Sequence, residues 1–175
     1  MKHVKSLGQK KGQIAGQIFI YIMAIIIIGT IIIIGAKAII GVGEKTCNAE
    51  KLNFKTDIES KIEEKNSFGS VTTKAFRAPC DYDSVCFVDR SYIGDNEFRC
   101  ERSKIIEDSV IAGVRDNIFV MSNKNTISIG YSDLVGLNPG PSGEKKCLCI
   151  DKLNGNFNIR FSGRGATTEI SNGAE

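Results

Sequence analysis

Hydrophobic residues are distributed very unevenly along this chain, and the longest apolar run comes near the start. From Ile18 to Ala36 nineteen consecutive residues carry no charge, and isoleucine dominates. A helix of that length reaches about 28 Å, close to the roughly 30 Å of bilayer hydrocarbon. Apolar side chains would cover every side of it, and lipid offers the backbone no hydrogen-bond partner but itself. The pattern therefore predicts a membrane-spanning helix.

Two other interpretations of this run are weaker. A buried core helix of a soluble protein rarely contains so long an uninterrupted apolar stretch. A cleaved secretory signal has an apolar region of only about 7–15 residues followed by a small-x-small site. Gly35-Ala36-Lys37 is a poor site of that kind.

The flanking charges predict the orientation. More lysines precede the run than follow it: Lys2, Lys5, Lys10 and Lys11 against Lys37 and Lys45. By the positive-inside rule the N-terminus stays in the cytoplasm and the rest of the chain lies outside. We therefore expect a single-pass protein of the cell membrane.

The chain then divides into four predicted segments. Gly41-Val42-Gly43 removes side-chain constraints and predicts a flexible linker after the span. The segments are a basic cytoplasmic leader (1–12), a hydrophobic helix (13–40), a glycine-containing linker (41–46) and an extracytoplasmic domain (47–175).

The first half of that domain predicts short elements separated by turns. Thr56-x-x-Glu59 has the form of a capping box, and Asp57 lies four residues before Lys61, which together predict a short helix to about Lys65. Residues 70–77 and 85–88 have the composition of strands. Residues 104–113 have apolar positions at helical spacing and end at a glycine, which predicts a second helix.

The second half predicts mainly strands. Residues 117–121 form a compact apolar run, residues 127–131 and 157–161 alternate, and a final strand is expected at 166–170. Turn-forming residues occur at 122–125, 138–141 and 154–155. An antiparallel sheet with one buried face, covered by two short helices, gives an α+β fold.

The charge distribution limits the kinds of molecule that this protein can bind. The formal net charge is +3, and both signs are interspersed after Thr46, so no basic stripe suited to nucleic acid is present in the sequence. We expect the lipid bilayer as a partner and exclude nucleic acid.

All six cysteines follow the apolar run: Cys47, Cys80, Cys86, Cys100, Cys147 and Cys149. An even number confined to the predicted exterior favours disulfides. Six cysteines allow fifteen pairings, and the sequence does not choose among them. Cys147 and Cys149 would share one face of a strand and have different partners.

Metal binding and catalysis find less support. A zinc site would need four of these thiolates, but paired Cys-x-x-Cys motifs are absent from the sequence and the single histidine, His3, precedes the apolar run. Cys147-Leu148-Cys149 suggests a thiol oxidoreductase only weakly, because its apolar strand context favours structural cysteines. We expect no enzyme activity, no cofactor and no metal.

The junction before the apolar run resembles the class III signal peptide of archaeal type IV pilins and archaellins. The resemblance covers about thirty residues and is carried by Lys10-Lys11-Gly12-Gln13 followed directly by the apolar segment. It implies that a prepilin-type peptidase cuts between Gly12 and Gln13, with Lys10 and Lys11 as the recognition pair. Many members carry glutamate at the fifth mature position for assembly, where this chain has Gln17.

The resemblance implies a membrane-anchored surface subunit that forms filaments or other homo-oligomers, or acts in adhesion. The alternative is an uncleaved single-pass protein whose extracytoplasmic domain binds a partner or acts as an accessory module.

Overall fold

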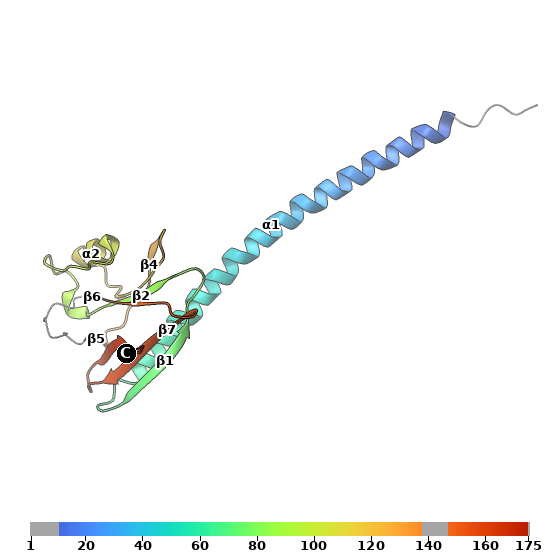
Figure 1. Ribbon diagram of the computed structural model, residues 1–175. Helices are drawn as coiled ribbons and strands as arrows, with labels where there is room; N and C mark the ends of the chain where they lie inside the picture. The colour runs from blue at the N-terminus through green and yellow to red at the C-terminus, as the bar shows by residue number, and fades with distance from the viewer. Residues whose placement is uncertain (1–10, 138–146, 175) are drawn as a thin grey trace, which may run out of the picture. The chain divides into compact units, whose positions relative to one another are not determined.

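The chain consists of two compact units, an N-terminal unit of residues Met1–Thr46 and a C-terminal unit of residues Cys47–Glu175. The computed structural model describes residues 11–137 and 147–174, without the side chains of residues 11–16 and 39–44 (Figure 1). Lys10 and the turn predicted at 138–141 lie outside the described residues.

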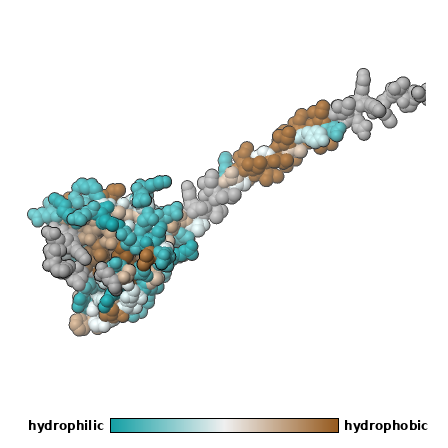
Figure 2. Space-filling view, viewed as in Figure 1, coloured by the Kyte–Doolittle hydropathy of each residue, from teal (hydrophilic) through white to brown (hydrophobic). Residues whose placement is uncertain are grey.

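The apolar run in the N-terminal unit is helical, as predicted. Helix α1 spans Lys11–Glu64, and within it Gln17–Ala38 is long and apolar enough to cross a membrane. None of that segment is buried within the chain, and Figure 2 shows hydrophobic side chains along it. The hydroxyl of Thr30 donates to the carbonyl oxygen of Ile26 at 2.7 Å. This polar group is therefore satisfied inside the helix, as a hydrocarbon environment requires.

Two predictions about the segment between the apolar run and the first strand are wrong. Residues 41–46 belong to α1, so the predicted linker is helical. Thr56 does not cap a new helix either, because it lies inside α1 and its hydroxyl donates to the carbonyl oxygen of Leu52 at 3.0 Å. Lys61 contacts Glu64 instead of the predicted Asp57. Continuing a helix adds one hydrogen bond per residue, whereas starting a second one requires a costly new nucleus.

Two four-stranded sheets form the C-terminal unit, where the sequence predicted one. The first has the order β1 (Val71–Arg77), β7 (Asn156–Gly163), β8 (Thr168–Asn172) and β5 (Val135–Leu137). The second has the order β4 (Thr126–Gly130), β3 (Ile118–Met121), β2 (Ser84–Val88) and β6 (Cys147–Asp151). A short 3-10 helix, η1 (Arg90–Tyr92), and helix α2 (Lys104–Ile111) follow β2. The predicted α+β class is confirmed.

The last turns of α1 hold the main core together. Phe54, Ile58 and Ile62 are spaced four residues apart on one face of the helix, and all three are buried. The ring of Phe54 packs edge-on against Phe76 of β1 and Phe157 of β7, with ring centroids 6.2 and 5.6 Å apart respectively. Buried residues from both sheets belong to this same cluster. In Figure 1 this part of α1 runs along β1 and β7.

A second core lies under α2, which was predicted within two residues of its observed end. Ser103 caps the helix by accepting from the N–H of Ile106 at 3.4 Å, and Gly113 beyond its end has a φ of 75°. Ile106 and Val110 are buried in a cluster with residues of β2 and β3. The helix is therefore fixed by its apolar face, as the spacing predicted.

Strand β5 was not predicted. It has only three residues, and it pairs with β8 in the parallel direction, with Val135 opposite Thr168. So short a segment shows no alternation in the sequence. Its place depends on long-range pairing, including the N–H of Thr168 donating to Leu134 at 2.7 Å.

The helix stripe gives a stability test. Ile58→Ala should lower the free energy of unfolding of the C-terminal unit by about 2–5 kcal/mol, because it empties a fully buried site. Leu52→Ala, at a side chain that is 63% exposed, should change it by less than about 0.5 kcal/mol. Urea unfolding of the full chain in detergent, followed by near-ultraviolet circular dichroism, measures both. Equal effects would contradict the assigned face of the helix.

Candidate functional site

All six cysteines are paired in three disulfides, which confirms that they bridge. The pairs are Cys47–Cys80, Cys86–Cys149 and Cys100–Cys147. Cys147 and Cys149 have different partners, as predicted from their shared strand face. These bridges close loops with sequence separations of 33, 63 and 47 residues, so they constrain most of the C-terminal unit.

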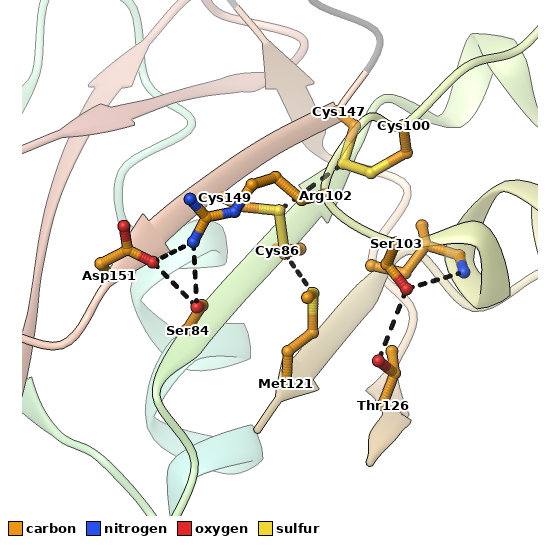
Figure 3. The surroundings of a disulfide bond; sticks show 11 residues. Ser84, Cys86, Cys100, Arg102, Ser103, Met121, Thr126, Cys147, Cys149 and Asp151 are labelled. Carbon is orange, nitrogen blue, oxygen red and sulfur yellow. Dashed lines mark hydrogen bonds and ion pairs between the residues drawn. A yellow bond between two sulfur atoms is a disulfide. The ribbon is translucent and has the colours of Figure 1, made fainter. Parts of the chain in front are cut away.

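Two of the disulfides meet at one face of the second sheet (Figure 3). Cys86 on β2 lies directly opposite Cys149 on β6, with Cα atoms 4.0 Å apart. Cys147, two residues before Cys149, bridges to Cys100 in the segment that leads into α2. The Sγ atoms of Cys147 and Cys149 are 3.7 Å apart. The cluster thus joins two neighbouring strands and α2's entry segment at one point.

Polar side chains surround this disulfide pair (Figure 3). Arg102 forms an ion pair with Asp151 at the end of β6, and the hydroxyl of Ser84 donates to the same carboxylate at 2.8 Å. On the other side the Sγ of Cys86 lies 3.2 Å from the Sδ of Met121. The two charged groups, Arg102 and Asp151, neutralise each other, so the arrangement has the features of a structural contact.

The remaining disulfide fixes the beginning of the C-terminal unit. Cys47 on α1 bridges to Cys80, which follows β1, with Cα atoms 5.3 Å apart. The carboxylate of Glu50, one turn further along α1, accepts from the N–H of Cys80 at 2.7 Å. This covalent and polar connection ties α1 to the first sheet just where the unit begins.

A metal site would need these cysteines as reduced thiolates. The Sγ atoms of Cys86, Cys147 and Cys149 lie within 4.8 Å of one another. Each is bonded to another sulfur in this structure, so none offers the thiolate that binds zinc. The chemistry of this donor set in its oxidised form is that of structural disulfides.

The Ser103-Lys104 pair and Glu107 have structural roles in the helix start. Ser103 caps α2, while Lys104 donates to Glu107 at 2.6 Å. Glu107 also accepts from the N–H of Cys100 at 3.3 Å. The hydrogen bond from Lys104 and, secondarily, the one from Cys100 hold the pKa of Glu107 below its ordinary value of 4.5, although burial opposes this. The contact between Lys104 and Glu107 was not predicted, although their i, i+3 spacing was a usable signal.

The predicted processing and assembly residues belong to the other unit. Lys11, Gly12 and Gln13 form the first turn of α1, and Gln17 is exposed one turn later. Lys10 is not among the described residues.

No protein-family model matches this sequence, and comparison with curated proteins and with solved structures finds no match. The chain is therefore defined by its own features: an apolar N-terminal helix followed by a small, disulfide-rich α+β domain.

The Cys47–Cys80 bridge gives a second test. Replacing both cysteines by serine should lower the free energy of unfolding by about 3–4 kcal/mol, the entropy of a loop closed over 33 residues. Asn48→Ser is a control for a polar change at a neighbouring exposed position. Urea unfolding measures stability, and peptide mapping without reduction checks the other two bridges. An unchanged midpoint would contradict the role given to this bridge.

Glu107 gives a test of pH dependence. Because its pKa is lower in the folded state, the unfolded state binds more protons between the two pKa values. Its contribution is complete above pH 4.5 and is lost as the pH falls through the folded pKa. Glu107→Gln should therefore be less stable than the natural chain at neutral pH. On unfolding in acid, the Glu107→Gln variant should also take up fewer protons than the natural chain, and the difference should be at most about one proton. Parallel stability curves from pH 7 to pH 3 would rule this out.

Proposed function

We propose that this protein is a pilin-like subunit of the cell surface, held in the membrane by the apolar part of α1 and displaying the disulfide-braced domain outside the cell. The observation that carries the proposal is the helix itself. Its large hydrophobic side chains from Ile18 to Ile34 lie on all sides of the helix and are exposed in the single chain. Such a surface needs lipid or other apolar helices around it.

Processing follows from the junction before the apolar run. A peptidase that cuts after Gly12 would remove the basic leader and leave the hydrophobic segment intact on the mature chain. Glycine keeps the backbone accessible there, and Lys10 and Lys11 hold the site at the anionic membrane surface. The same helix then serves first as an anchor and later as the core of a filament, where copies cover one another.

The disulfides support placement of the C-terminal unit outside the cytoplasm. Three bridges in a domain of this size fit an oxidising compartment, and together with the lysine-rich leader they favour a cytoplasmic N-terminus. We assign the unit a structural or adhesive role without catalysis or a cofactor.

One observation favours the alternative of a permanent anchor. Gln17 can hydrogen-bond a neighbour's terminal amine but cannot neutralise its charge in a low-dielectric helix bundle. In that case the leader stays attached, and the C-terminal unit recognises a partner as part of a single-pass membrane protein.

The mature N-terminus distinguishes the two functions. The pilin-like role predicts a chain that begins at Gln13, identified by mass spectrometry of the protein purified from its native membrane. Gly12→Val should abolish cleavage, because the branched side chain blocks the approach to the peptide bond. Gly16→Ala, four residues later, should leave cleavage unchanged. An intact Lys11-Gly12-Gln13 junction in the native protein would reject the pilin-like role.

A further inference from the structure

One aromatic side chain protrudes from the turn between α1 and β1. Phe68 is 83% exposed, more than any other large hydrophobic residue in the described part of the chain. Val71, at the start of β1, is also exposed. An exposed aromatic side chain on a fixed turn can anchor an interface when it fills a pocket of a partner.

Hydrogen bonds hold this turn in one conformation. The hydroxyl of Ser70 lies 2.8 Å from the carbonyl oxygens of both Lys65 and Ser67. The N–H of Gly69 donates to Gly163 at 3.1 Å, and the N–H of Gly163 donates back to Ser70 at 2.7 Å. A Cβ atom at Gly163 would lie 2.0 Å from the oxygen of Ser67, so this close approach requires glycine. Because the turn is already ordered, docking Phe68 costs little conformational entropy.

A pocket of suitable size lies at the other end of β1. It has a volume of about 250 Å³ and is formed between α1 and the segment after β1. Its apolar lining comes from Phe54, Phe76, Ala78 and Pro79, and Asn53 lies at its exposed side. A cavity of roughly 150 Å³ with apolar walls is enough to hold benzene. The pocket is open to solvent on one side, and its volume is large enough for a phenyl ring to enter there and pack on the apolar part of its lining.

Phe68 cannot reach the pocket of its own chain. The two features lie at opposite ends of β1, and the strand from Val71 to Arg77 is about 20 Å long. We propose that Phe68 of one copy inserts into this pocket of a second copy. The contact rests on the assembly proposed above and names the surface through which copies meet. Because the two surfaces differ, each copy keeps a free Phe68 or a free pocket, and the contact propagates head to tail.

Charges around the two surfaces favour this occupant. Two acidic residues, Glu50 and Asp57, and one basic residue, Arg77, line the pocket, whereas Lys65 and Arg164 lie beside the Phe68 turn. Both basic groups also pair with glutamates, Lys65 with Glu64 and Arg164 with Glu169, so the attraction is modest. The guanidinium of Arg77 can stack on an inserted ring.

Photo-cross-linking of the full chain in detergent micelles tests the contact. Phe68 is replaced by p-benzoylphenylalanine, and cross-linked dimers are mapped by mass spectrometry. We expect adducts between position 68 and residues 50–57 or 76–79 of a second copy. The same probe in place of Ile105, which is 57% exposed on α2, is the control and should give at least about tenfold fewer dimers. An absence of dimers, or adducts at other residues, would overturn the proposal.

Filling the pocket gives an independent readout. Asn53→Trp places a large ring at the mouth of the pocket and should reduce the yield of the Phe68 adduct at least about tenfold. Leu52→Trp, at the adjacent exposed position outside the lining, is the matched control and should leave the yield unchanged. Near-ultraviolet circular dichroism checks that both variants are folded. Equal yields for the two variants would contradict insertion into this pocket.

Failure of this contact and failure of the proposed function are separable. Filaments of chains that begin at Gln13, with no adduct at the pocket, would overturn the Phe68 contact and keep the pilin-like role. An adduct at the pocket in a chain that retains its leader would support the contact and reject that role.

Discussion

The surface of one helix constrains everything else about this protein. Between Gln17 and Ala38 the side chains are almost all apolar, and the chain covers none of them itself. Burying a single isoleucine is worth about 1.5–3 kcal/mol, so leaving this many in water is far costlier than any local preference of the backbone. The helix therefore needs lipid or other apolar helices around it, and the proposed membrane anchor meets that need.

The C-terminal unit, in contrast, buries most of its hydrophobic side chains within the chain itself. It is a small domain whose core depends on the last turns of α1, so the same helix that is apolar all round in one unit carries a single buried stripe in the other. The stripe of Phe54, Ile58 and Ile62 connects both sheets. Disulfides then add covalent links at three places: between the start of the unit and the segment after β1, between β2 and β6, and between β6 and the approach to α2.

Periodic signals in the sequence were sufficient for much of this fold. The alternation of Phe157, Ile159 and Phe161 predicted β7, and the spacing of Ile106 and Val110 predicted α2, because in both cases one face packs on a core. The capping box at Thr56 misled, since a local signal competes with a helix that already continues through it. The second sheet, β5 and the disulfide pairs depend on contacts between distant residues, such as the Cys86–Cys149 register, which no local pattern encodes. Nothing in the sequence distinguished Phe68 from a core aromatic residue.

Topology is the most direct test of the account. Intact cells are treated with an amine reagent that cannot cross membranes, and labelled lysines are identified by mass spectrometry. We expect labelling of Lys124 and Lys152 in the C-terminal unit before any permeabilisation, with the chain recovered in the membrane fraction after carbonate extraction. Labelling of these lysines only after lysis, or release of the chain by carbonate, would contradict the claim that the apolar helix anchors an external domain.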